Sequence, residues 1–236
     1  MRRTMWAITL LAIAPGVAAQ VDSYPRPASM SAFLMDRADE IALARSAAPE
    51  SIAREATVLI LGPDGYTTGV EGTNGFVCLV ARGWLAAFDW AEYWNARVRA
   101  ADCLNPAAAS FLVPLFKLRS ELVMRGSSRE EVLAAVRNGY ASGALPTLEQ
   151  GAIEYMMSPV AYLTDTGGNQ PHLMFLTSSD DAGSWGANLE KSPVMAAPYW
   201  FFFSDDPALL KGLPQVMVVL VAVPTWSDGS ADETEN

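Results

Sequence analysis

The stretch TVLILGPDGYTTGVEGTNGFVCLVAR, residues 57–82, decides the fold because strand-forming runs alternate in it with turn residues. Three runs are rich in the β-branched and aliphatic side chains that favour strands: residues 57–61, 66–70 and 76–80. The sequences GPDG at 62–65 and GTNG at 72–75 separate these runs, and both are strong turn signals. We therefore expect an antiparallel three-stranded meander with Cys78 in its third strand.

Helical spacing of apolar residues predicts helices before and after this meander. Apolar residues recur three or four positions apart over residues 30–48. A second pattern covers residues 107–140, where Gly126 ends one helix and the sequence SSREE at 127–131 offers a capping box for the next. Asn105 and Pro106 offer a cap and a first helical position for the first of these two helices, but Pro114 interrupts its pattern, so the alternative start is near Pro114.

The C-terminal half of the chain predicts further strands. The candidates are residues 153–157, 161–164, 172–177, 199–203 and 215–223. The last run is apolar throughout, which is typical of a buried central strand. The expected fold is α+β: an antiparallel sheet covered by the helices of residues 30–48 and 107–140, in a single globular domain spanning residues 29–225.

The N-terminus has the layout of a secretory signal peptide. Two arginines are followed by an apolar run, residues 5–14, and then by small residues up to Ala19. A membrane span needs about 20 apolar residues, roughly twice this run. We therefore expect removal of residues 1–19, a flexible leader over residues 20–28, an acidic disordered tail over residues 226–236, and a periplasmic or secreted mature protein without a membrane span.

The charge balance narrows the classes of partner. The chain has 16 basic and 26 acidic residues, a formal charge of −10, and loss of the two N-terminal arginines makes the mature charge −10 − 2 = −12. An acidic surface repels phosphate backbones, which argues against nucleic acid as a partner. The expected partner is a small ligand or an envelope protein.

The two cysteines, Cys78 and Cys103, allow two interpretations. In an exported protein, a pair of cysteines is most simply one disulfide. The competing interpretation is that Cys78 is a free thiol acting as a nucleophile. A disulfide would remove that nucleophile.

His172 is the single histidine of the chain. It is the side chain whose ordinary pKa lies closest to neutral pH, so it is the natural candidate for a general base. Its position in an apolar strand pattern favours a structural role, and we expect it to be structural. The alternative pairs His172 with Cys78, or with a serine such as Ser184, as the catalytic residues of a hydrolase. Papain-like peptidoglycan endopeptidases have the same cysteine-then-histidine order, although their cysteine opens a helix.

An aromatic segment follows the meander and includes Trp84, Trp90 and Trp94. Their spacing predicts a short helix that covers the sheet, with these side chains in the core. The alternative is that the three tryptophans form an aromatic platform for a sugar or another apolar ligand.

Cofactor and metal motifs are missing from the sequence. It has no phosphate-binding glycine loop, no dinucleotide fingerprint, no Cys-x-x-Cys pair and no Gly-x-Ser-x-Gly elbow. One histidine cannot supply a multi-histidine zinc or iron site from this chain alone. We therefore expect no cofactor and no metal.

The runs Gly72–Val80 and Pro171–Phe175 resemble a group of uncharacterised exported bacterial proteins, over roughly residues 41–223. That resemblance implies an exported single domain and no particular activity. Taken together, the sequence favours a non-catalytic secreted or periplasmic protein that binds a ligand or a partner. Its candidate binding surfaces are the aromatic segment and the run Tyr199–Phe203. A cell-envelope hydrolase is the alternative.

Overall fold

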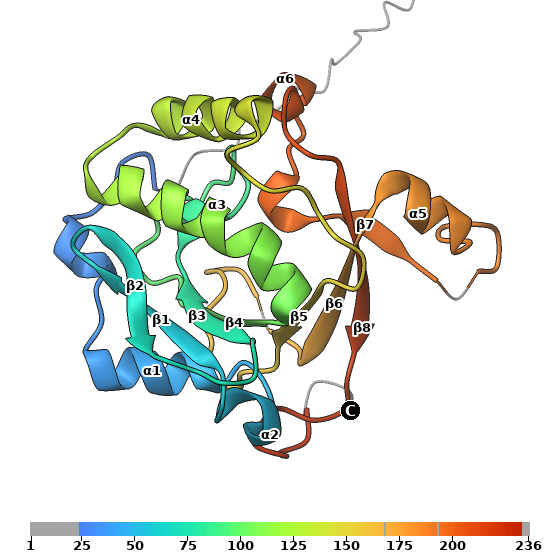
Figure 1. The fold of residues 1–236 in the computed structure, drawn as a ribbon, viewed down its shortest axis with the longest axis horizontal. Helices are drawn as coiled ribbons and strands as arrows, with labels where there is room; N and C mark the ends of the chain where they lie inside the picture. Colours follow the sequence, from blue (N-terminus) through green and yellow to red (C-terminus); the bar gives the residue numbers. More distant parts are fainter. Residues whose placement is uncertain (1–23, 168, 193, 233–236) are drawn as a thin grey trace, which may run out of the picture.

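A computed structural model describes residues 24–167, 169–192 and 194–232, so the predicted signal peptide lies outside the described residues. Within them, eight strands form one mixed sheet in the order β2-β1-β3-β4-β5-β6-β8-β7 (Figure 1). The strands are β1 (Thr57–Gly62), β2 (Gly65–Val70), β3 (Val77–Ala81), β4 (Ala100–Leu104), β5 (Ile153–Met156), β6 (His172–Ser178), β7 (Ala196–Pro198) and β8 (Val216–Ala222). The α+β class is confirmed.

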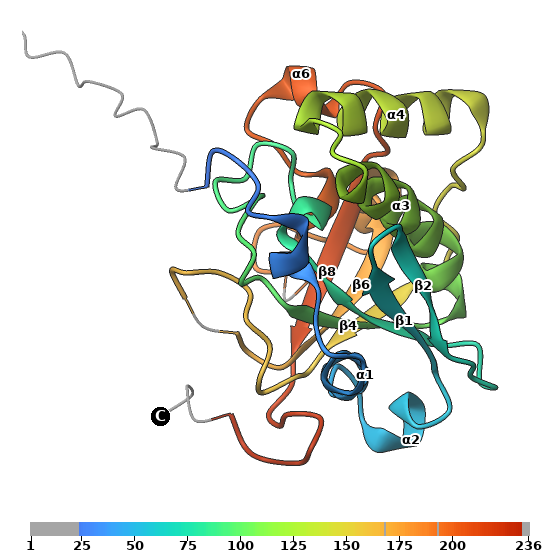
Figure 2. The ribbon, with the colours of Figure 1, turned by 90° about the vertical axis from the view of Figure 1, so that its left-hand side faces the viewer.

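Helices precede the first strand and lie between later strands along the chain. The α-helices are α1 (Arg37–Arg45), α2 (Glu50–Ala53), α3 (Pro106–Met124), α4 (Arg129–Ser142), α5 (Ser179–Ser184) and α6 (Pro207–Leu210). Three short 3-10 helices are η1 (Met30–Phe33), η2 (Gly83–Leu85) and η3 (Trp200–Phe202). Helices α1 and α3 lie on opposite sides of β1, β3 and β4 (Figure 2). The part of the sheet around β4 is therefore covered by a helix on each face.

The predicted meander is correct for its first hairpin and wrong for its third strand. Strands β1 and β2 pair antiparallel across the GPDG turn. Strand β3 instead lies on the other side of β1 and runs parallel to it, with Thr57 opposite Val77 and Val58 opposite Cys78. The sheet is therefore mixed rather than purely antiparallel.

The loop between β2 and β3 explains this parallel pairing. Its backbone packs against the start of β1: the amide of Thr73 donates to the Glu55 carbonyl at 2.8 Å, and the amide of Gly72 donates to Oγ1 of Thr57 at 3.1 Å. A Cβ at Gly72 would lie 2.1 Å from the Thr57 amide nitrogen. The GTNG sequence therefore carries the chain across the end of β1, and it does not form a hairpin.

The remaining strand pairs are antiparallel, but β8 is not the buried central strand that its apolar sequence predicts. It pairs with β6 along its whole length and with the three-residue β7 only over Met217–Val219. Beyond that point Leu220 is 54% exposed and Val221 is 41% exposed. Because β7 is so short, the C-terminal half of β8 forms an open edge of the sheet.

Capping residues decide where the helices begin. The predicted helix over residues 30–48 is divided into η1 and α1, because the Asp36 side chain accepts hydrogen bonds from the amides of Ala38 and Asp39 and starts a new helix. Helix α3 begins directly after Asn105 and continues through Pro114, so the alternative start near Pro114 is wrong.

The end of α3 and the start of α4 follow the predicted pattern. Gly126 follows the last turn of α3 with a φ of +88°, which favours glycine. Ser128 accepts from the Glu131 amide, and the Glu131 side chain accepts from the Ser128 amide, so the predicted capping box is confirmed.

The aromatic segment after β3 is not the predicted helix. Beyond η2 the chain follows separate three-residue turns, such as the bond from the Tyr93 amide to the Trp90 carbonyl. Buried Glu92 and Asn95 bond to a distant loop, and these tertiary contacts outweigh the helical spacing of the aromatic side chains.

Two other predicted strands also take a different form. Residues 161–164 contribute one isolated bridge, between Tyr162 and Arg99. Residues 199–203 contain η3, in which the consecutive side chains of Phe201 and Phe202 are both buried. A strand would send one of these two side chains to each face of the sheet, so the 3-10 turn buries more aromatic surface.

Both predicted terminal segments have described parts that contact the domain. In the leader, the Tyr24 hydroxyl donates to Asp165 at 2.5 Å. In the tail, the Ser227 amide donates to the Met157 carbonyl and its hydroxyl to the Ser46 carbonyl. Residues 20–23 and 233–236 lie outside the described residues.

Candidate functional site: a pocket over the sheet

The cysteines are joined by a disulfide that bridges neighbouring strands. Cys78 of β3 lies directly opposite Cys103 of β4, and both residues are completely buried. The next partners along the same row of the sheet are Tyr155 of β5 and Leu173 of β6. Directly paired residues share a face, so Leu173 lies on the cysteine face of the sheet.

His172 therefore lies on the opposite face from Cys78, since adjacent residues of a strand alternate between faces. The structure does not bring Cys78 and His172 together, and the disulfide leaves Cys78 without a free thiol. Ser184 lies in α5, after the far end of β6, where its hydroxyl donates to the Asp181 carbonyl. Neither nucleophile that was considered for a hydrolase lies beside His172.

The three tryptophans separate into two groups. Trp84 is fully buried with its indole N–H on the Ser120 hydroxyl at 2.9 Å, and Trp94 is buried against Tyr93. These two side chains belong to the core, as the structural interpretation predicts. Trp90 is half-buried and packs edge-to-face on Trp200, with ring centroids 5.3 Å apart. The three therefore do not form one platform.

Trp90 and His172 both line a pocket on the face of the sheet opposite the disulfide. The pocket has a volume of about 470 Å³ and is mostly apolar. Its floor is formed by residues of β4, β5, β6 and β8, and three segments, around residues 86–98, 163–166 and 198–201, complete its wall. Lining residues of the floor and wall include Ala100, Asp102, Met156, His172, Leu220, Trp90, Thr164, Tyr199 and Trp200.

Strand register places two titratable side chains on one row of this floor. Met156 pairs with His172, and the β4–β5 register carried one residue further sets Asp102 opposite Met156. Strands lie about 4.8 Å apart, so the Cα atoms of Asp102 and His172 are about 10 Å apart, with Met156 between them. Both side chains point to the pocket face.

Asp102 has a second carboxyl beside it. Leu104 lies on the same face as Asp102 and pairs directly with Glu154, so the two acids share that face on adjacent strands. Both are completely buried. The Tyr199 hydroxyl donates to Oε2 of Glu154, and no amide, hydroxyl or cationic donor of the described residues reaches either Asp102 oxygen.

The two carboxyls are close enough to share a proton. Burial raises the pKa of Asp102 well above its ordinary value, and the charge of Glu154 and a hydrogen bond between the carboxyls raise this pKa further. Burial raises the pKa of Glu154 to about 7, although hydrogen bonds from Tyr199 and Asp102 oppose that rise. Burial and the neighbouring carboxyl therefore disfavour ionisation of both acids at once.

His172 faces the same pocket in its neutral form. Its Nδ1 lies 2.6 Å from the Gln170 carbonyl oxygen, which can only accept, so Nδ1 carries the proton and Nε2 does not. Burial lowers the pKa of His172, and the bond to the carbonyl partly opposes this. The imidazole can therefore accept a hydrogen bond or a proton through Nε2.

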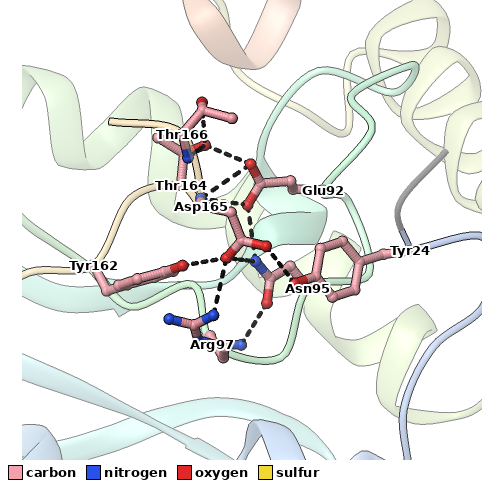
Figure 3. A network of polar contacts seen from close by, with 8 residues as sticks. All are labelled: Tyr24, Glu92, Asn95, Arg97, Tyr162, Thr164, Asp165 and Thr166. Atoms are coloured by element: carbon pink, nitrogen blue, oxygen red, sulfur yellow. Dashed lines mark hydrogen bonds and ion pairs between the residues drawn. The ribbon is translucent and has the colours of Figure 1, made fainter. Parts of the chain in front are cut away.

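A polar network holds the segments around the pocket together (Figure 3). Asp165 accepts from Tyr24, Tyr162 and Asn95, and it forms an ion pair with Arg97 at 3.2 Å. Two of these bonds, from Tyr162 and Tyr24, lower the pKa of Asp165 most. The network joins the leader, the aromatic segment and the loop before β6.

Buried Glu92 is the second centre of this network. It accepts from the Asn95 amide group at 2.8 Å, from the Thr164 hydroxyl and from the Asp165 backbone amide at 3.0 Å. Thr164 also lines the pocket, so these bonds fix the wall at that position. Each polar side chain named in this network has a hydrogen-bond or ion-pair partner, which is typical of a structural role.

The sequence interpretation missed Asp102 and Glu154, whereas the run Tyr199–Phe203 was a predicted binding surface and three of its residues line the pocket. The sequence does single out the two acids. Asp102 is the one charged residue in the strand sequence AADCL, and Glu154 is the one charged residue in IEYMM. Charged residues are almost never fully buried unless they are paired. Such a position therefore indicates either an error in the predicted strand or a functional group. The hydroxyl of Tyr199 had no comparable signal.

Other kinds of site do not emerge from the described residues. In residues 24–167, 169–192 and 194–232, no group of three or more metal-ligating side chains is found. Within the same ranges, no helix is long and apolar enough to cross a membrane. No known protein family, curated protein or solved structure matches the chain.

Proposed function

We propose that the protein is a binding protein that acts outside the cytoplasm and holds a small, largely apolar ligand in the pocket over β4, β5, β6 and β8. The observation that carries this proposal is a preformed apolar pocket of about 470 Å³ with a few polar groups at fixed positions. Asp102 at its floor lacks a donor from the described residues, and Nε2 of His172 is unprotonated.

The exposed aromatic and aliphatic residues around the pocket support this proposal. Trp200 is 45% exposed and Leu220 is 54% exposed, and both line the pocket. Leaving such side chains partly in water costs free energy that an apolar ligand would recover. The ligand therefore gains buried contact area at the same place where it meets the polar groups of the floor.

A filled-pocket variant tests the proposal. Leu220→Trp places a bulky ring at the pocket, and Val221→Trp is its matched control, because Val221 is the next residue on the same strand and points to the other face. The probe is N-phenyl-1-naphthylamine, a neutral dye that fluoresces in apolar surroundings. We expect the wild type and Val221→Trp to bind one dye molecule each, and Leu220→Trp to lose this binding.

The proposal fails if the wild type does not bind the dye in a one-to-one complex, or if both tryptophan variants bind it equally well. Thermal melting of all three proteins checks that each one is folded.

Cell-envelope hydrolysis is the second candidate, and the position of His172 in the pocket favours it. Because Cys78 and Ser184 are both remote from His172, His172 would act as a base on a water molecule. Because burial lowers the pKa of His172, such an activity should persist until the pH falls below its ordinary value of 6.5. A screen of ester, amide and peptidoglycan substrates with wild type and His172→Gln would support this candidate if the turnover depends on His172.

A further inference from the structure

The floor of the pocket carries negative charge without a cation to balance it. Asp102 and Glu154 are both completely buried, and the pKa of about 7 for Glu154 leaves that carboxyl largely ionised above neutral pH. No salt bridge to either acid occurs among the described residues. Arg82 also lines the pocket, but its guanidinium pairs with buried Glu40 at 2.7 Å and donates to two backbone carbonyls.

Other pocket groups do not neutralise this charge. Burial keeps His172 neutral, since it lowers the pKa of the imidazole. The Tyr199 hydroxyl, whose pKa burial and Glu154 raise, stays protonated and donates to Glu154. Both side-chain oxygens of Asp102 are buried and accept no hydrogen bond from the described residues. A buried charge in apolar surroundings is costly unless it meets an opposite charge.

The wall of the pocket complements a cation with an apolar body. The rings of Trp90 and Trp200 pack edge-to-face with centroids 5.3 Å apart, and both side chains line the pocket. The faces of aromatic rings attract cations, and their area also covers apolar groups. The acidic floor and the aromatic wall thus favour the same kind of ligand.

We propose that the pocket takes an organic amine: a ligand with a primary or secondary ammonium group turned toward Asp102 and Glu154, and an apolar body against Trp90 and Trp200. This inference rests on the proposed ligand-binding function and names the chemical class of the ligand. The ammonium group supplies the donor that Asp102 lacks and the positive charge that the acid pair lacks.

A matched pair of probes tests the ligand class. 4-Phenylbutylamine and 4-phenylbutan-1-ol have the same number of heavy atoms and the same shape, but only the first is cationic. At pH 8, above the pKa of about 7 for Glu154, titration calorimetry should show the amine binding at least about tenfold more tightly than the alcohol. At pH 5, below the pKa of about 7 for Glu154, that acid is protonated and this preference should shrink.

The acid pair is tested by the double variant Asp102→Asn with Glu154→Gln, which keeps size and removes charge. Its control, Glu149→Gln with Asp205→Asn, removes two acids from exposed positions. We expect the acid-pair variant to bind the two probes with equal affinity and the control to keep the preference for the amine. Thermal melting establishes that both variants fold, and the comparison of the two probes on the wild type does not depend on either variant.

The outcomes separate the two proposals. If the wild type binds both probes equally well at pH 8, the amine inference is overturned and the ligand-binding function stands. If the amine preference survives in the acid-pair variant, the inference is overturned because the acids do not cause that preference. If neither probe binds and the dye does not bind either, the ligand-binding function itself is overturned.

Discussion

Asp102 and Glu154 are the residues at which the demands of stability and of binding conflict most clearly. Each buries a carboxyl group that water would solvate in the unfolded chain. A hydrogen bond from Tyr199 offsets only part of that cost. A fold selected for stability alone would place apolar side chains here, as it does at neighbouring Leu104 and Met174. The retained acids therefore indicate a role in what the pocket holds.

The acid pair should make the protein less stable as the pH rises. The pKa of each acid is higher in the folded state than its ordinary value, so the native state binds more protons than the unfolded state. Their contribution is most favourable below about pH 4 and is lost as the pH rises through about 7, the pKa of Glu154.

Urea denaturation of the wild type and of Asp102→Asn with Glu154→Gln measures this effect. We expect the free energy of unfolding of the variant, minus that of the wild type, to increase from pH 5 to pH 8. Taking the difference removes the opposite contribution of His172, whose pKa is lowered and which both proteins share. A difference that stays constant over this range would show that the acids titrate as they do in the unfolded chain.

The interactions of single residues could be predicted from the sequence where composition or short spacing determines them. Pairing of Cys78 with Cys103 follows from composition, and the bond between Ser128 and Glu131 follows from their spacing. The pair of Asp102 and Glu154 could not be predicted as a pair, because 52 positions separate them and only the register of β4 on β5 brings them together. Trp90 likewise needed the position of Trp200 to be recognised as part of a pocket.

At the level of elements, the crossing from β2 to β3 determines the topology of the sheet. The chain turns at the GTNG sequence and lies so close to β1 that the missing side chain of Gly72 is a requirement. The same sequence is a good hairpin signal, and nothing local distinguishes a hairpin from a crossing. That is why the direction of β3 was mispredicted, although the strand itself was correctly placed.

Gly72→Ala should disrupt this crossing. Its Cβ would lie 2.1 Å from the Thr57 amide nitrogen and 2.3 Å from the Ala56 carbonyl carbon, and backbone must shift to admit it. We expect a loss of about 3 kcal/mol or more in the free energy of unfolding, measured by urea denaturation. Gly167→Ala is the control, because a Cβ there meets nothing within 4 Å. Equal stabilities of the two variants would contradict the close packing at Gly72.

The disulfide strengthens the junction between β3 and β4. It closes a loop with a sequence separation of 25, and the chain-entropy relation gives about 3.5 kcal/mol of stabilisation for a loop of this length. Cys78→Ala with Cys103→Ala should therefore unfold at a lower urea concentration by a corresponding amount.

Thiol titration of the denatured, unreduced wild type should find no free thiol. Two titratable thiols in exported material would show that the bridge does not form, and Cys78 would again be a free cysteine. It would still lie on the sheet face opposite His172.

In the whole molecule, the two faces of the sheet have different contents. One face carries the disulfide and α1, while the other carries α3 and the pocket. Two of the three wall segments, around residues 86–98 and 163–166, lack regular secondary structure and are held by Glu92 and Asp165 (Figure 3). Such a wall cannot be predicted from periodicity, since its contacts join residues that are up to 141 positions apart.

The contact of Tyr24 with the pocket wall lies close in sequence to the predicted cleavage site of the signal peptide. Removal of residues 1–19 would leave a mature chain that starts at Gln20, four residues before Tyr24, whose hydroxyl is bonded to Asp165. Cleavage requires a small residue directly before the cut and tolerates a larger one at the position before that.

We therefore expect wild-type protein from the periplasm or the medium to have an intact mass that begins at Gln20. Ala19→Phe should remain uncleaved in the membrane fraction, whereas its matched control Ala18→Phe should be cleaved and released, because only Ala19 directly precedes the cut. Cleaved protein should also contain the Cys78–Cys103 disulfide, since this bond persists in an oxidising compartment. Full-length wild-type chain in the cytosol, with both thiols reduced, would contradict export and with it the proposal that the pocket works outside the cytoplasm.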